Sequence, residues 1–101
     1  MFLVRRVFKV KPRTARKAAE IITQMGKIYE EAGQRSTSRV YISGGSVPGP
    51  ANTVYMDWVE ESLRSPYRED NVLPDMSDLY SQLREVQEET YIEFYELFSP
   101  R

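Results

Sequence analysis

The chain contains no cysteine and no histidine among its 101 residues. Without cysteine it has neither disulfides nor thiolate nucleophiles. Without histidine it lacks the most common metal and haem ligand, and also the side chain that most readily exchanges protons at neutral pH. These two absences argue against haem chemistry, zinc centres and histidine-based catalysis. We expect neither a metal nor a cofactor.

The sequence also lacks a long apolar run and an excess of either charge. The segment 2–10 is interrupted by Arg5, Arg6 and Lys9, so it has neither the core of a signal peptide nor the length of a membrane span. Fourteen basic residues against fifteen acidic ones leave a net charge of −1, which does not attract phosphate backbones or anionic lipid from a distance. We therefore expect a cytoplasmic protein with no membrane or nucleic-acid partner.

The composition of the chain is that of a packed domain. Its residues are 41% hydrophobic, 29% charged and 12% aromatic, which is too apolar for a disordered tail. A chain of this length has room for only one core. We predict a single domain that covers residues 1–101.

The first third of the chain predicts a strand followed by a helix. Residues 2–10 are rich in β-branched and aromatic side chains and precede a Lys-Pro pair, which favours extended backbone and ends a ladder. Apolar residues recur at helical spacing over 14–32, with Thr14 as a candidate N-cap. Gly33 follows, where a helix C-terminus favours glycine. The predicted helix is long enough to cover the strand.

A long-tipped hairpin is predicted in the middle of the chain. Two strands, 36–43 and 53–60, flank the glycine- and proline-rich run 44–52. A register that is symmetric about this tip aligns residues of compatible chemistry. The predicted pairs are Arg39 with Asp57, Val40 with Met56, Tyr41 with Tyr55 and Ile42 with Val54.

A connection and a second helix follow the hairpin. Residues 61–75 contain two prolines and no clear hydrophobic period, and loops of this length are usually lids or mobile segments. Asp75 and Asp78 resemble a capping pair at the start of a helix. An apolar stripe at helical spacing, from Met76 to Thr90, predicts the helix itself.

Residues 91–98 alternate as a final strand that ends before Pro100. The resulting order is that of the ferredoxin-like α+β fold, βαββαβ, with one four-stranded antiparallel sheet in the order 4-1-3-2 and both helices on one face. Even-numbered strand residues are expected to face the helices and form the core: Phe2, Val4, Phe8, Val10, Val40, Ile42, Val54, Met56, Trp58, Ile92, Phe94 and Phe98.

The odd-numbered face of this sheet is too apolar to be left bare. It mixes tyrosines with both signs of charge, a composition typical of contact surfaces. Its area of about 400 Å² is comparable to the largest apolar patches on monomers. We therefore predict a homodimer that buries this face, with the interface residues Val7, Arg39, Tyr41, Tyr55, Asp57 and Tyr95.

Two even positions, Arg6 and Glu96, break the apolar pattern of the covered face. One register between the first and last strands places them opposite each other, and it also pairs Phe8 with Phe94, Val4 with Phe98 and Lys9 with Glu93. A buried Arg–Glu pair adds little net stability, because desolvation offsets the attraction. Either the pair is partly solvated at a strand centre or edge, or it marks a polar requirement inside the domain.

A chain of this length with one βαββαβ unit, a half-apolar open sheet face and Trp58 at the end of the third strand resembles the dimeric α+β barrel superfamily. That superfamily includes antibiotic-biosynthesis monooxygenases and NIPSNAP proteins. The resemblance implies that two sheets pack face to face across a two-fold axis, and that ligands lie in a cleft between each sheet and its own helices. Trp58 matches the tryptophan that lines this cleft in the monooxygenase-like members. The histidine and the first-strand asparagine of haem-degrading members have no counterpart, since Val4 and Arg6 occupy the inward positions.

We therefore expect a protein that binds or transforms a small organic molecule in the cleft. Arg6 and Glu96 are the candidate catalytic residues, because an arginine can hold an anionic or enolate oxygen and a glutamate of raised pKa can move a proton. A cofactor-independent activity of the monooxygenase or isomerase kind fits these roles. The candidate ligand-binding residues are Trp58, Tyr67, Arg68 and Phe94.

Two other functions are compatible with the sequence. A purely structural or regulatory dimerisation module would have a filled cleft, whereas open space around Arg6 would favour ligand binding. An RNA-binding sheet would stack bases on Tyr41, Tyr55 and Tyr95. Residues 53–58, however, lack the basic and glycine-aromatic pattern expected on such a strand.

Overall fold

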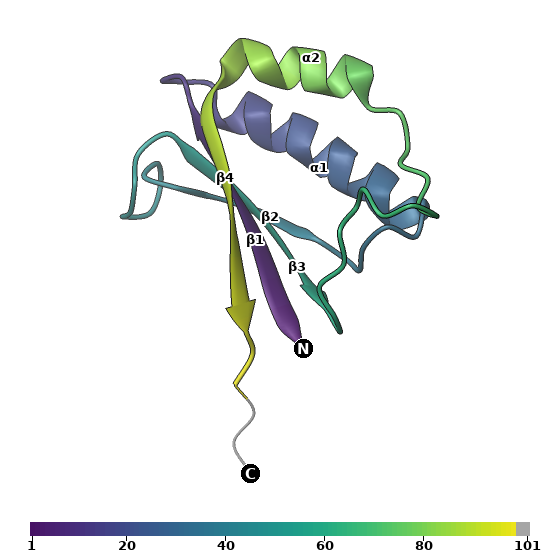
Figure 1. The fold of residues 1–101 in the computed structure, drawn as a ribbon. Coiled ribbons are helices and arrows are strands. Elements are labelled where there is room, and N and C mark those ends of the chain that lie inside the picture. Colours follow the sequence, from purple (N-terminus) through teal and green to yellow (C-terminus); the bar gives the residue numbers. More distant parts are fainter. Residues whose placement is uncertain (99–101) are drawn as a thin grey trace.

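The computed structural model describes residues 1–98, which form six elements (Figure 1). The predicted ferredoxin-like α+β order is confirmed. No helix within the described residues is long and apolar enough to cross a membrane. The last strand ends at Glu96 rather than at residue 98 as predicted, and Pro100 lies outside the described residues. The elements are β1 (Phe2–Val10), α1 (Ala15–Glu31), β2 (Arg39–Ser43), β3 (Thr53–Glu60), α2 (Ser77–Val86) and β4 (Gln87–Glu96).

The four strands form one antiparallel sheet in the order β2-β3-β1-β4, which is the predicted order read from the other edge. Both helices lie on the same side of this sheet, and its other face is open (Figure 1). We call the two sides the covered face and the open face. β1 and β3 form the centre of the sheet, so residues on these strands lie farthest from its edges.

The core lies between α1 and the central strands. Val4, Phe8 and Val10 point from β1 toward the helices, because successive side chains of a strand point to opposite faces. Apolar residues at helical spacing give α1 the buried stripe that packs on them. The buried positions of α1 are Ala18, Ile21, Ile22, Met25 and Gly26.

Gly26 lets α1 lie close to the sheet. A Cβ atom at this position would lie 2.7 Å from Ser38 Oγ and 2.9 Å from Met56 Cε, closer than packed atoms allow. Glycine inside a helix costs about 1 kcal/mol relative to alanine. A side chain at position 26 would displace the ends of the Ser38 and Met56 side chains, which pack against α1 here.

The helix ends differ in part from the sequence expectation. Thr14 occupies the N-cap position of α1, but its hydroxyl donates to the Lys11 carbonyl at 2.6 Å and caps no helix amide. Gly33 follows the helix with a φ of +71°, as predicted for a C-terminal glycine. At α2 the Asp75 carboxylate accepts a hydrogen bond from the Ser77 amide at 3.0 Å, which lowers the pKa of Asp75.

The hairpin register is confirmed. Arg39, Val40, Tyr41 and Ile42 lie opposite Asp57, Met56, Tyr55 and Val54. β2 begins at Arg39 rather than at residue 36, although Ser36 donates a hydrogen bond to the Val59 carbonyl at 2.6 Å. Symmetry about the turn therefore located the pairing correctly.

The predicted boundary between α2 and β4 is wrong. Thr90, which was assigned to the helical stripe, lies in β4, where its hydroxyl donates to the Val7 carbonyl at 2.9 Å. The Lys11 amide donates to the Val86 carbonyl at 2.9 Å, so the chain joins the sheet as soon as α2 ends. These contacts to β1 override the helical period of the sequence.

The predicted pairing of β1 with β4 is wrong by four residues as a consequence. Arg6 lies opposite Ile92, not Glu96, and Glu96 lies opposite Phe2 at the exposed end of the strand. Arg5, not Lys9, pairs with Glu93, and their side chains form an ion pair of 2.7 Å. The other two predicted pairs also fail, since Phe8 lies opposite Thr90 and Val4 lies opposite Phe94.

The last part of β4 carries apolar residues that the helices do not cover. Ile92 and Phe94 belong to the predicted core, yet they are 40% and 55% exposed. The ten residues of α2 span about 15 Å, whereas the ten residues of β4 span about 33 Å. Because α2 is too short to cover the whole strand, this end of the covered face opens into a cleft.

Candidate ligand-binding cleft

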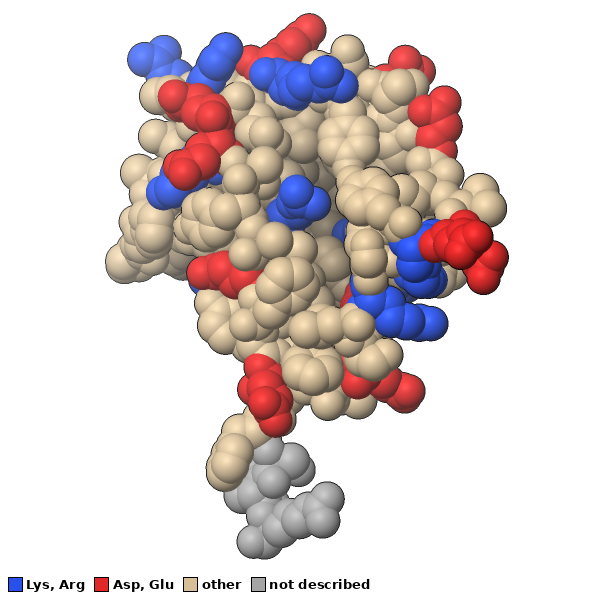
Figure 2. Space-filling view, in the orientation of Figure 1, with Lys and Arg blue, Asp and Glu red and all other residues tan. Residues whose placement is uncertain are grey.

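A cavity lies between the covered face of the sheet and the two helices. Its volume is about 290 Å³, and we call it the inner chamber. In the space-filling view, a hollow between the helix layer and the sheet exposes a basic side chain (Figure 2). The buried walls of the inner chamber are apolar and come from β1, α1, β3 and α2, namely Phe8, Ile22, Met25, Met56 and Leu83.

A second and smaller cavity adjoins the inner chamber. This outer chamber has a volume of about 140 Å³ and lies between the end of β4 and the connection 61–75. Four residues line both chambers and form what we call the neck, namely Arg6, Tyr29, Arg35 and Tyr80. The two chambers therefore meet at a point that two arginines and two tyrosines define.

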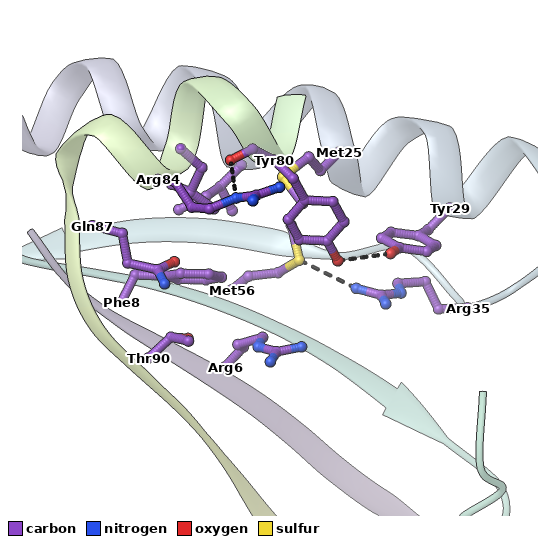
Figure 3. A pocket seen from close by; sticks show the side chains of 12 residues that line it. Arg6, Phe8, Met25, Tyr29, Arg35, Met56, Tyr80, Arg84, Gln87 and Thr90 are labelled. Atoms are coloured by element: carbon purple, nitrogen blue, oxygen red, sulfur yellow. Dashed lines mark hydrogen bonds between the residues drawn. The ribbon is translucent and has the colours of Figure 1, made fainter. Parts of the chain in front are cut away.

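The two tyrosines of the neck join the helices. The hydroxyl of Tyr29 on α1 lies 3.1 Å from the hydroxyl of Tyr80 on α2 (Figure 3). Burial and this hydrogen bond raise the pKa of Tyr29 to about 12. The Tyr29 hydroxyl is therefore protonated at neutral pH, and either hydroxyl can donate to a ligand oxygen if their mutual bond opens.

Arg35 is held between two aromatic rings. Its guanidinium carbon lies 4.0 Å from the centre of the Tyr29 ring and 3.8 Å from that of the Trp58 ring. Nη1 donates to the thioether sulfur of Met56 at 3.4 Å, a weak acceptor (Figure 3). Desolvation lowers the pKa of Arg35, and the nearby positive charge of Arg6 lowers it further. The rings fix the plane of the guanidinium without neutralising its charge.

Arg6 and Arg35 each have a buried hydrogen-bond donor without an acceptor in the described residues. The Nε atoms of both are buried, and neither has a hydrogen-bond partner in residues 1–98. In Figure 3 the two guanidinium groups point toward one another. The negative charge of Glu60 raises the pKa of Arg35. The hydrogen bond that the Glu60 carboxylate accepts, however, comes from the Trp58 indole N–H, at 2.7 Å. The neck is therefore a positively charged point next to the apolar wall of the inner chamber.

The structure brings most of the predicted site residues together. Arg6, Trp58, Tyr67, Arg68 and Phe94 all line the outer chamber. Glu96 does not belong to this group, because the shifted register of β4 places it at the exposed strand end.

Three residues of the neck were not identified from the sequence. Tyr29 and Tyr80 were visible as members of helical stripes, and a polar-tipped residue on the inner face of each helix is a usable signal. Arg35 lies in the turn after α1, and no local pattern indicates that it folds back between Tyr29 and Trp58.

The open face holds a different arrangement of charges. Arg39 donates two hydrogen bonds to the Asp57 carboxylate, at 2.9 and 3.1 Å, and the Tyr41 hydroxyl donates a third at 2.8 Å. Burial and the bond to Asp57 raise the pKa of Tyr41 to about 12. The Tyr41 and Tyr55 rings stack with their centres 5.1 Å apart, and the Tyr55 hydroxyl lies 2.8 Å from Ser43 Oγ. Every polar tip in this cluster has a partner.

Arg5 links the remaining part of the open face. Its ion pair with Glu93 raises the pKa of Arg5 and lowers that of Glu93. The guanidinium carbon lies 5.1 Å from the Tyr55 ring centre and 6.0 Å from that of Tyr95. Beside it, Tyr91, Tyr95 and Leu97 remain more than 40% exposed. Within residues 1–98, no group of three acidic side chains lies close enough to hold a metal ion.

The fold is shared with NIPSNAP domain proteins. Over its whole length the chain superposes on all of a NIPSNAP domain protein from Burkholderia xenovorans, with a TM-score of 0.65 and 14% identity. A NIPSNAP-like domain protein of the same organism matches with a TM-score of 0.62 and 15% identity, over 99% of this chain and 89% of that one. A protein from Agrobacterium tumefaciens matches with a TM-score of 0.56 and 15% identity, over 95% of this chain and 92% of that one. No family model and no curated protein sequence matches the chain.

Proposed function

We propose that this protein is a cytoplasmic homodimer that binds a small organic anion in the cleft between its sheet and helices. The proposal is carried by the buried Nε atoms of Arg6 and Arg35 at the neck, which have no hydrogen-bond partner in the part of the chain that the structure describes. A buried charge without hydrogen-bond partners is costly. A carboxylate or enolate oxygen at the neck would offset that cost, since guanidinium groups hold such oxygens in charge-assisted hydrogen bonds.

Open space in the cleft supports binding over a purely structural role. A structural module needs a filled cleft, whereas about 290 Å³ lie free beside Arg6 and Met56. Trp58 adds a flat aromatic surface to the outer chamber, which Tyr67 and Arg68 of the connection 61–75 also line. These residues are proposed to contact the bound molecule, as is Phe94.

A chemical step at this site would rest on the four neck residues, Arg6, Arg35, Tyr29 and Tyr80. Two arginines can stabilise negative charge that develops on a substrate oxygen, and a tyrosine hydroxyl can donate a proton or hydrogen bond to it. Glu96 has no part in this proposal because it lies away from the cleft.

The open face is proposed as the dimer interface. Its exposed tyrosines and Leu97 surround ion pairs that are already satisfied within the subunit, so burying them against a second copy strands no unpaired charge. RNA binding has less support. Asp57 and Glu93 lie among the tyrosines, and Tyr55 is buried and stacked on Tyr41 rather than free to receive a base.

Native mass spectrometry of the purified protein tests both parts. The proposal expects a mass near twice 11.8 kDa, with an added small acid or the ability to take one up from a panel of benzoate, octanoate and phosphate. Arg6→Met and Arg35→Met should lose the bound acid, and Arg16→Met, an exposed arginine of α1, should retain it. Equal binding by all variants, or no binding of any acid, contradicts the proposed anion site.

The interface is tested best at Tyr95. Tyr55 is only 8% exposed and is stacked and hydrogen bonded within its own subunit, so replacing it would also disturb the sheet. Because Tyr95 is 43% exposed, we expect Tyr95→Arg to keep the fold and to produce monomers through charge repulsion between the two subunits. Tyr67→Arg on the connection 61–75 is the matched control. A dimer of unchanged affinity in Tyr95→Arg contradicts the interface.

A further inference from the structure

Most of the wall of the inner chamber is apolar, although the polar side chains of Arg84, Gln87 and Thr90 also line it. Phe8, Ile22, Met25 and Leu83 are all buried and apolar. At the rim, the Thr90 hydroxyl already donates to the Val7 carbonyl, and Arg84 donates to the Tyr80 carbonyl at 3.4 Å. Water in such a space would find few partners, so the chamber suits an apolar occupant.

The inner chamber suits an apolar group, but the neck at one end of it requires a negatively charged group. Arg6 and Arg35 bring two positive charges to the boundary of the inner chamber. Because Tyr29 and Trp58 sandwich Arg35, its guanidinium cannot swing out to water without losing both contacts. An occupant of the chamber must therefore carry a negative group at the end that reaches the neck.

The sizes of the chambers decide which way the occupant points. Since water fills about 30 Å³ of liquid per molecule, the inner chamber has room for roughly ten non-hydrogen atoms and the outer chamber for roughly five. The outer chamber is also more polar, because Glu60, Arg64 and Arg68 line it. The larger, apolar part of a ligand therefore fits on the inner side of the neck.

We infer that the ligand is an amphipathic monocarboxylic acid, whose carboxylate lies between Arg6 and Arg35 and whose apolar body of roughly ten carbon atoms fills the inner chamber. This inference rests on the proposed anion site and adds the class and orientation of the molecule. Met25 and Met56 line the chamber, and their unbranched, flexible side chains allow it to accept bodies of different length.

A series of straight-chain acids from butanoate to tetradecanoate tests the inference. The quenching of the single tryptophan, Trp58, reports binding because this ring lines the outer chamber and stacks on Arg35. Affinity should rise about fourfold with each added methylene and level off near about ten carbons. The alcohols of the same lengths should bind at least about tenfold more weakly. A naphthoate arm shows whether the chamber prefers an alkyl chain or a flat ring.

Substitution of Met25 tests the chamber through the preferred chain length of the acid, which can be compared even if the variant is less stable. Met25→Ala enlarges the inner chamber, so the acid of highest affinity should become longer by two or more carbons. Met76→Ala makes the same change in a buried residue that does not line the chamber, and its preferred chain length should stay that of the unaltered protein.

The possible failures are distinguishable. Affinity that does not depend on chain length, or a preference unchanged by Met25→Ala, overturns the inference about the inner chamber. If short acids still bind and Arg35→Met abolishes that binding, the proposed anion site stands without it. If no acid of any length binds, both the anion site and the inference are wrong.

Discussion

The arginines on the two faces of the sheet differ in whether they have ion-pair and hydrogen-bond partners. Arg5 and Arg6 are neighbours in β1, but strand alternation sends them to opposite faces. On the open face Arg5 pairs with Glu93 and Arg39 pairs with Asp57. On the covered face Arg6 and Arg35 have buried Nε atoms without a partner in the described part of the chain. The same type of side chain has its hydrogen-bond partners on the open face and lacks some of them on the covered face.

This difference fits the roles proposed for the two faces, the open face as the dimer interface and the covered face as the ligand-binding site. Charges that are paired within the subunit can be buried against a second copy at little further cost. Unpaired arginines beside an empty chamber lower stability unless a ligand supplies the missing acceptors. Under the proposed function, the covered face therefore holds the arginines whose hydrogen-bonding capacity is met only when an anion binds.

The largest expected stability effect is on the open face. Asp57→Ala removes three hydrogen bonds from a side chain that is 4% exposed and leaves Tyr41 without its acceptor. We expect the free energy of unfolding to fall by about 2 to 3 kcal/mol. Urea unfolding at fixed protein concentration measures it, with the exposed Glu61→Ala as control. A loss below about 0.5 kcal/mol would mean that this network does not stabilise the sheet.

The corresponding change on the covered face should be far milder. Arg35→Met replaces an incompletely bonded charge by a residue that still contacts the Tyr29 and Trp58 rings. We expect the free energy of unfolding to change by less than about 1 kcal/mol in either direction. The same urea experiment checks it. A loss of about 3 kcal/mol would identify Arg35 as a structural residue and remove the contrast between the faces.

Tyr29 and Tyr41 sharpen the comparison, because each face holds one tyrosine whose pKa is raised to about 12. Tyr29→Phe should cost about 1 kcal/mol at neutral pH through the lost bond to Tyr80. Since the folded pKa exceeds the ordinary value of 10, this stabilisation is full below about pH 10 and disappears as pH rises toward about 12. Spectroscopic titration of the phenolates follows it, with the exposed Tyr67→Phe as control. The titration of Tyr29→Phe should lack a phenolate that forms late, at about pH 12. If this variant instead lacks a phenolate that forms at lower pH, the raised pKa does not belong to Tyr29.

The smallest effect is expected at Glu93. Arg5 lowers the pKa of this carboxyl, so its contribution to stability is present above the ordinary value of 4.5 and is lost as pH falls through the lowered pKa. Glu93→Gln should unfold at a lower urea concentration than the unaltered protein at pH 7. The two midpoints should converge once the pH falls below the lowered pKa of Glu93. A gap that persists at the acidic end would show that the ion pair is not its cause.

The sequence predicted the elements and the hairpin register because local rules govern them. Alternation located β1 and β3, and symmetry about the tip aligned Tyr41 with Tyr55. The pairing of β4 was missed because Thr90 and its neighbours fit a helical stripe as well as a strand. Contacts from the distant β1, including the bond from Thr90 to the Val7 carbonyl, decide that choice.

The candidate site could be predicted only in part. Arg6 and Trp58 were recognised because they lie on strands, where alternation tells which face a residue occupies. Arg35 follows the end of α1, and its position depends on how that helix end approaches β3 rather than on its neighbours in sequence. Glu96 was assigned to the site only through the mistaken register of β4.

Calorimetric titration of four single variants with decanoate and benzoate tests the central claim most directly. Arg6→Met and Arg35→Met should bind both acids at least about tenfold more weakly than the unaltered protein, because each removes one of the charge-assisted partners. Arg5→Met and Arg39→Met should retain the original affinity, since their arginines are already paired on the open face. Equal losses in all four variants, or no loss in any, would contradict the division of the sheet into a packing face and a binding face.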